Sequence, residues 1–122
     1  MLPALPAYKK SRLIVQKGIE NIALKVEDIA FVYTENKMFY VIDSSGKKYL
    51  CDQNLSELEE QLDERLFFRA NRQHIININY IRGFKVVKRV KLQVELKLSA
   101  STHSVIVSQE TAPLFKKWIY EA

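Results

Sequence analysis

The chain has 122 residues, 48% of them hydrophobic and 27% charged, which fits one globular domain with a single core. No apolar stretch is long enough to cross a bilayer, and the start lacks the features of a secretory signal. A single cysteine, Cys51, excludes an internal disulfide, and the net charge of +5 favours a polyanionic partner. We therefore expect a cytoplasmic protein without membrane attachment.

The first ten residues contain two prolines and small side chains and end in two lysines. We expect residues 1–10 to be a flexible arm or linker remnant, and residues 11–122 to form one folded domain. So abrupt a start suggests a domain taken from a longer protein.

Aromatic and β-branched residues predict strands over most of the chain. In the first half, the expected strands are Arg12–Lys17, Ile19–Lys25, Ile29–Thr34, Met38–Asp43 and Lys48–Cys51. In the second half we expect a hairpin of Ile81–Lys88 and Lys91–Ser99, then a strand at His103–Val107.

Two helices are predicted between and after these strands. Leucines recur at helical spacing within residues 54–64, where Asn54 and Glu57 have the spacing of a capping box. Apolar residues at helical spacing also predict a short helix over residues 112–121. The predicted class is mostly β, with one or two short α-helices.

Charge is distributed unevenly along the chain. Residues 52–64 contain six carboxylates and no cation, whereas residues 65–97 contain nine cations and one carboxylate. This pattern predicts either one electropositive surface beside another that repels nucleic acid, or two solvated faces of opposite sign.

The segment Phe67–Asn77 places polar and cationic side chains between the apolar runs Leu66–Phe68 and Ile75–Ile78. Anchoring at both ends predicts that the polar part is presented as a rigid loop. Arg, Asn and Gln have the forked donors and acceptors that read base edges and grip phosphate. We therefore expect DNA binding through loops held on a β scaffold.

Each polar residue of this loop has a binding and a structural interpretation. Arg72 either contacts a guanine edge or a phosphate, or pairs with a carboxylate of the acidic helix. Arg69 either joins it or braces the loop through backbone carbonyl groups. Asn71 and Gln73 suit adenine edges, although Asn71 can equally cap backbone groups. His74 is expected to point inward.

Further candidates lie in other turns. Lys88 and Arg89 at the hairpin tip would contact phosphates. Asn36 and Lys37 form either a second contact loop or an ordinary turn. Ser108 either caps the last helix or contacts DNA, and Gln109 could read an adenine edge.

Nothing in the sequence predicts catalysis, a cofactor or a metal site. The two histidines do not have metal-ligand spacing with Cys51 or a carboxylate, and none of the three glycines lies in a phosphate-binding loop. The carboxylates cluster on a helix face instead of pairing in an apolar site. We therefore do not expect an enzyme.

The run Phe68-Arg69-Ala70-Asn71-Arg72-Gln73-His74-Ile75-Ile76-Asn77 resembles the signature Phe-x-Arg-x-His-Arg-Ser-x-x-Val-Asn of the LytTR family (LytR/AlgR type). That family is the DNA-binding output domain of many bacterial response regulators, and this version is similar to Bacteroidetes-type members. The resemblance extends from about Arg12 to Ile119. It includes the helix start Leu55-Ser56-Glu57-Leu58 and the final Phe115-Lys116-Lys117-Trp118.

The resemblance implies stacked antiparallel β-sheets that insert loops into successive major grooves of double-stranded DNA. It places Arg69 and Asn71-Arg72-Gln73 in the central loop, Asn36-Lys37 in the first and Ser108-Gln109-Glu110 in the third. Many members have His at the position of Asn71 and Arg at that of Gln109. Both differences remove potential positive charge from these loops.

Family members usually bind paired direct repeats, which implies two copies on DNA and a possible homodimer. They also usually carry an N-terminal receiver domain, which this chain lacks, so regulation is expected from a longer chain or a partner. The first alternative is a protein-interaction module that has lost DNA binding. A second is single-stranded RNA binding through an aromatic surface of Tyr33, Phe39, Tyr40 and Tyr49.

Overall fold

The computed structural model describes residues 9–122, so residues 1–8 of the predicted arm lie outside the described residues. The other two arm residues contact a helix. The Lys9 ammonium donates to the carbonyl oxygen of Glu60 at 2.8 Å, and the Lys10 N–H donates to that of Gln61 at 3.0 Å.

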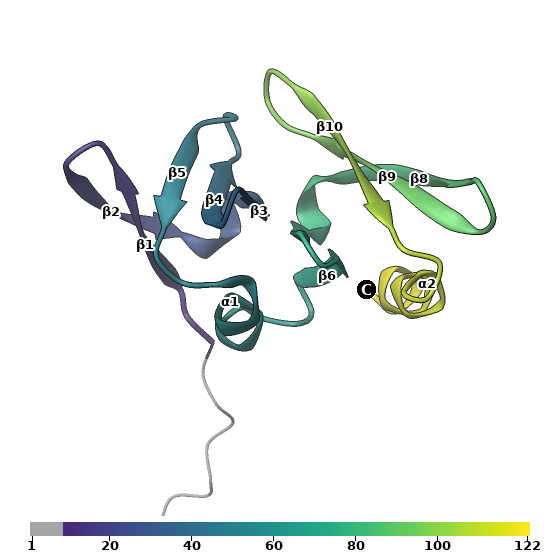
Figure 1. Cartoon of the computed structure of the whole chain (residues 1–122). Helices are drawn as coiled ribbons and strands as arrows, with labels where there is room; N and C mark the ends of the chain where they lie inside the picture. Colours follow the sequence, from purple (N-terminus) through teal and green to yellow (C-terminus); the bar gives the residue numbers. More distant parts are fainter. Residues whose placement is uncertain (1–8) are drawn as a thin grey trace, which may run out of the picture.

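Antiparallel strands make up most of the described chain (Figure 1). The first half contains β1 (Arg12–Lys17), β2 (Glu20–Lys25), the 3₁₀ turn η1 (Val26–Asp28), β3 (Ile29–Glu35), β4 (Met38–Asp43), β5 (Lys48–Cys51) and α1 (Leu55–Gln61). The second half contains β6 (Phe67–Asn71), β7 (His74–Asn77), the 3₁₀ turn η2 (Ile78–Tyr80), β8 (Ile81–Val87), β9 (Lys91–Lys97), β10 (Thr102–Val107) and α2 (Ala112–Glu121).

The strands form a seven-stranded sheet in the order β2-β1-β5-β4-β3-β7-β6 and a three-stranded sheet in the order β10-β9-β8. Helix α1 covers one face of the larger sheet, where Leu58 packs in a core with Val15 and Val41. The smaller sheet and α2 cover part of the other face, where Phe115 shares a second core with Ile76. The predicted mostly β fold of stacked antiparallel sheets is confirmed.

Alternating burial explains why these segments are strands. In β9, Leu92, Val94 and Leu96 are fully buried, while the residues between them are partly exposed, as expected for a strand with one face on a core. The capping box is also confirmed, because Asn54 Oδ1 accepts the Glu57 N–H at 2.8 Å and Glu57 Oε1 accepts the Asn54 N–H at 3.2 Å.

The structure corrects the predicted end of the first helix and the predicted central loop. The first helix ends at Gln61 and not at residue 64, because Leu62 is extended and Asp63 forms a turn in which its carboxylate accepts the Arg65 N–H. The polar part of the segment Phe67–Asn77, predicted as a rigid loop between two apolar runs, belongs to a β-hairpin of β6 and β7. Strand pairing satisfies its backbone groups, and only Arg72 and Gln73 form the turn.

Asn77 joins this hairpin to the neighbouring strand through a buried hydrogen bond. Its Nδ2 donates to the Ile29 carbonyl oxygen at 2.8 Å, and its Oδ1 accepts the Asn79 N–H at 2.9 Å. The side chain has 0% exposure, so without it the Ile29 carbonyl group would lose a partner in a buried site and the Asn79 N–H would lose one in a partly buried site.

We expect Asn77→Ala to lower the free energy of unfolding by about 1–3 kcal/mol, the cost of leaving buried polar groups unsatisfied. Asn79→Ala is the matched control, because it keeps the backbone N–H that Asn77 accepts. Urea denaturation of both variants measures the difference. Equal stabilities would contradict this role of Asn77.

Candidate nucleic-acid interface

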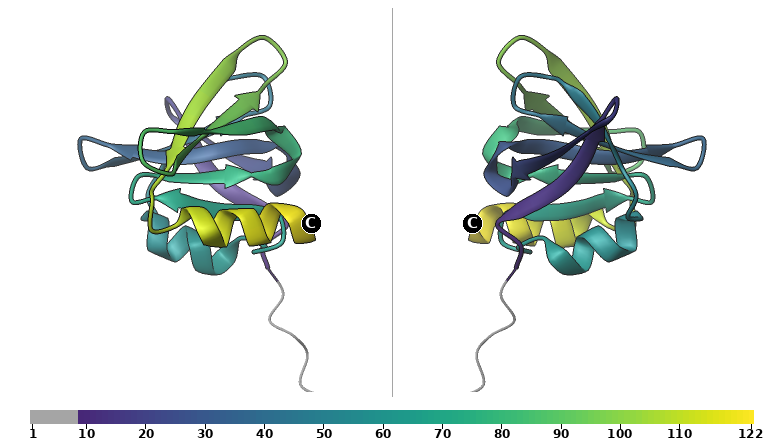
Figure 2. Two further views of the ribbon diagram at one scale, coloured as in Figure 1. Left: turned by 90° about the vertical axis from the view of Figure 1, so that its right-hand side faces the viewer. Right: turned by 90° about the vertical axis from the view of Figure 1, so that its left-hand side faces the viewer.

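Four turns that are far apart in the sequence project toward the same side of the molecule, as the left-hand view of Figure 2 shows. They connect β3 to β4, β6 to β7, β8 to β9, and β10 to α2. We call this surface the turn face and define it by residues 36–37, 72–73, 88–90 and 108–110. Every residue predicted to contact DNA lies in these turns, except Arg69 and Asn71, which precede the second turn.

Two observations place neighbouring turns together. The Thr34 N–H, near the end of β3, donates to the Gln73 carbonyl oxygen at 3.0 Å. An open groove of about 1050 Å³ lies between the second and fourth turns. It is lined by Arg69, Asn71, Arg72, Gln73, Ser108, Gln109, Glu110, Thr111 and Pro113.

Arg72 is exposed at the tip of the β6–β7 hairpin. Within residues 9–122, its guanidinium forms no ion pair or hydrogen bond. The predicted alternative, pairing with a carboxylate of the acidic helix, is therefore absent from the described structure. The side chain keeps all of its donors available for a partner.

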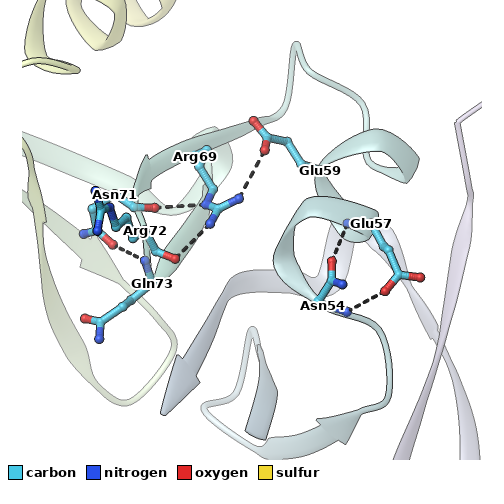
Figure 3. Close-up of polar contacts among 7 residues, drawn as sticks. All are labelled: Asn54, Glu57, Glu59, Arg69, Asn71, Arg72 and Gln73. Carbon is cyan, nitrogen blue, oxygen red and sulfur yellow. Dashed lines mark hydrogen bonds and ion pairs between the residues drawn. The ribbon is translucent and has the colours of Figure 1, made fainter. Parts of the chain in front are cut away.

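Arg69 is the residue that pairs with the acidic helix (Figure 3). Its Nε donates to the carbonyl oxygen of Asn71 at 3.0 Å, and its Nη2 donates to that of Arg72 at 2.8 Å. Its Nη1 lies 3.3 Å from Glu59 Oε1. These contacts match the bracing interpretation of Arg69, because its guanidinium group donates to the backbone carbonyl groups of the tip.

Asn71 also uses its side chain within the protein. Its Nδ2 donates to the Ile106 carbonyl oxygen at 2.6 Å, which joins the tip to β10. Its Oδ1 accepts the Gln73 N–H at 2.7 Å and lies 3.1 Å from His74 Nδ1. Figure 3 shows the Gln73 side chain pointing away from this cluster. Of the two amide side chains, Asn71 and Gln73, that of Gln73 is therefore the one left free within the described residues.

His74 points inward, as predicted. Its ring stacks on that of Tyr33 at a centroid distance of 6.0 Å and is half-buried. Burial lowers the pKa of His74, because a charged imidazolium would lose water there.

The turn before α2 combines a structural residue with exposed ones. The Ser108 carbonyl oxygen accepts the N–H groups of Thr111 and Ala112, and the Ser108 hydroxyl donates to the Thr111 hydroxyl at 2.8 Å. Ser108 therefore holds the entrance of the helix. Gln109 and Glu110 are exposed beside it.

The remaining two turns are tight turns that present cations. Asn36 and Lys37 have φ of 52° and 65°, and Arg89 and Val90 have φ of 50° and 62°, the combination of the tight turns that join paired strands. Lys37, Lys88 and Arg89 are exposed, and none of them forms an ion pair within the described residues.

Among residues 9–122, the four aromatic residues of the RNA-binding alternative do not form a fully exposed surface of the kind on which bases stack. Tyr49 is buried, and its hydroxyl donates to Asp43 at 2.8 Å. Tyr33 and Tyr40 are half-buried, and the Lys48 ammonium lies 4.0 Å from the Tyr40 ring centre. One of these rings is therefore buried, and the other two are partly covered by the protein.

The sequence did not indicate two partners of the central tip. Glu59 lies ten positions before Arg69, and nothing in that spacing predicts their pairing across two elements. The Ile106 partner of Asn71 is a backbone carbonyl group, which has no side-chain signature. Cys51, by contrast, is buried as predicted, and burial raises the pKa of its thiol.

Neither a metal site nor a membrane helix is found in the described part of the chain. No group of three or more His, Cys, Asp or Glu side chains in residues 9–122 is arranged to hold a metal ion. Neither helix of that range is long and apolar enough to cross a membrane.

Comparison with known proteins adds a family and a fold. The sequence profile of the LytTr DNA-binding domain family matches residues 20–120. Among solved structures, the chain is similar to the LytTr DNA-binding domain of a Bacillus cereus protein described as a methyl-accepting/DNA response regulator. The TM-score is 0.81 at 22% identity, over 90% of this chain and 97% of that chain. No curated protein matches the chain significantly.

Protonation of His74 is expected to destabilise the fold. Because its folded-state pKa lies below the ordinary value of 6.5, the unfolded chain takes up this proton first as the pH falls. The stability contribution is therefore complete above the ordinary pKa and is lost as the pH falls below it. Between about pH 7 and pH 5, the urea midpoint of His74→Gln should fall less than that of the wild type. An equal fall in both proteins would contradict the effect.

Proposed function

The chain belongs to the LytTr DNA-binding domain family, and on this basis we propose that it binds a specific double-stranded DNA sequence. In this proposal it is the output module of a two-component response regulator and controls transcription in the cytoplasm. A receiver domain provides the regulation in this proposal.

The turn face is the observation that carries this proposal. Four turns present exposed cations and amides at one side of a rigid β scaffold. A major groove about 12 Å wide admits a two-stranded β-ribbon, and the β6–β7 hairpin is such a ribbon. Recognition therefore uses hairpin tips, and no helix needs to enter the groove.

The free side chains divide between base reading and phosphate binding. Arg72 has a free guanidinium, which can donate two parallel hydrogen bonds to the N7 and O6 of guanine. Gln73 and Gln109 have exposed amides suited to adenine. Lys37, Lys88 and Arg89 contact phosphates and set the register of the protein on the duplex.

The other predicted contact residues support these readers. The side chains of Asn71 and Arg69 form hydrogen bonds with backbone groups around the tip. The Ser108 hydroxyl forms one at the entrance of the last helix. Asn36 supplies the left-handed backbone that presents Lys37. A tip with a fixed backbone favours base readout, because base readout requires donors at fixed positions.

Selection of bound fragments from a random duplex pool, using the purified domain, tests the proposal directly. Enrichment of one sequence motif is the expected result. If every duplex binds alike, or none binds, a protein-interaction role replaces DNA recognition.

Replacing Arg72 by Ala should reduce the preference for the selected duplex over a scrambled one by about 1–3 kcal/mol, the value of one good bidentate base contact. Lys88→Ala is the control, because loss of a phosphate contact should weaken both duplexes alike and reduce the salt slope by about 1. Fluorescence anisotropy at several salt concentrations measures both effects. Unchanged preference in Arg72→Ala would show that this tip is not the reader.

Two copies are expected to bind side by side on direct repeats. A duplex with two copies of the selected sequence in the same orientation, about 10–10.5 bp apart, places both on one side of the DNA. It should bind two protein molecules, and more tightly than the same half-sites in inverted orientation. Native mass spectrometry gives the stoichiometry, and a single bound molecule would contradict the arrangement.

A further inference from the structure

We propose that Glu59, on the acidic helix α1, is a positioning residue for DNA recognition, because it holds the arginine that fixes the reading tip. This inference rests on the proposed function. It assigns a role to a carboxylate that lies outside the turn face and whose charge would repel DNA.

The chain of contacts runs from α1 to the tip. Glu59 accepts from Arg69 Nη1 at 3.3 Å. The same guanidinium donates from Nε and Nη2 to the carbonyl groups of Asn71 and Arg72. The Asn71 carbonyl group lies at the end of β6 and that of Arg72 in the turn, so the orientation of the guanidinium fixes the path of the backbone from which Arg72 projects.

The tip needs this support because its backbone is not the usual one for a two-residue hairpin. Such hairpins favour positive φ at both central residues, as at Asn36 and Lys37. Neither Arg72 nor Gln73 has positive φ. The pairing register shifts between Arg69 and Asn71, so side chains must determine how the tip is directed.

The tip is held from two sides. Asn71 ties it to β10 through the Ile106 carbonyl group, and Arg69 ties it to α1 through Glu59. Without Glu59, the guanidinium would keep its two bonds to the carbonyl groups but lose its anchor on the larger core. The tip could then turn about the remaining tie to β10.

The ion pair between Arg69 and Glu59 is partly shielded from water. The side chain of Arg69 is 26% exposed and that of Glu59 is 53% exposed. Both line a groove of about 390 Å³ whose walls include Phe67, Phe68 and Leu114. Partial removal of water strengthens the attraction, although the exposure of Glu59 keeps it moderate.

The test compares Glu59→Gln with Glu60→Gln. Both variants remove one negative charge from exposed positions on α1, but the Glu60 side chain has no partner within the described residues. Repulsion alone predicts that both bind every duplex slightly more tightly. Positioning predicts that only Glu59→Gln reduces the ratio of selected to scrambled affinity, by about two- to fivefold.

A double-mutant cycle tests whether Glu59 acts on the affinity ratio through Arg69. Once Arg69→Gln has removed the brace, adding Glu59→Gln should reduce the affinity ratio no further. Additive losses, or equal ratios in Glu59→Gln and Glu60→Gln, would overturn the inference.

Nuclear magnetic resonance of the free protein separates this inference from the proposed function. Glu59→Gln should shift the amide signals of Arg72 and Gln73 and increase their motion, while Glu60→Gln should leave them unchanged. If the wild-type protein shows no preference between duplexes, the proposed function fails. If the preference is present but the tip signals are unmoved in Glu59→Gln, only the positioning role fails.

Discussion

The hydrogen bonds that Asn71 and Arg69 make around the β6–β7 tip are the constraint on which the rest of the proposed recognition surface depends. Together they use the carbonyl groups of Asn71, Arg72 and Ile106 and the N–H of Gln73. Because the side chains of Asn71 and Arg69 hold the backbone of the tip, the side chains of Arg72 and Gln73 point outward from a fixed frame. Preorganisation of this kind lowers the entropy cost of binding.

Much of the fold could be predicted, because its elements follow from local chemistry. Alternation identified β9, the Asn54 and Glu57 pair identified the start of α1, and β-branched and aromatic runs identified most strands. The central hairpin was missed because its polar turn was treated as a longer loop. Its strands are short, and Ala70 and Ile76 are buried by contacts from distant segments, which no local pattern reports.

The sequence predicted that the candidate residues lie in turns, but not which of their side chains have partners inside the protein. Forked and cationic side chains in turns pointed to the turn face. Arginine and asparagine, however, serve equally as readers and as braces, and the choice is made by tertiary partners. Arg69 pairs with Glu59 and Asn71 with the Ile106 carbonyl group, and these contacts favour the bracing interpretation of both. The resemblance of the central run to the LytTR signature pointed to this segment without separating these roles.

The most direct test of the account is a map of the DNA contact surface by nuclear magnetic resonance titration of the labelled domain with its selected duplex. The account predicts that the largest signal changes fall in residues 36–37, 72–73, 88–90 and 108–110, with smaller changes on the outer face of α1. Changes centred on α1 or on β1 and β2, with the four turns unaffected, would contradict it.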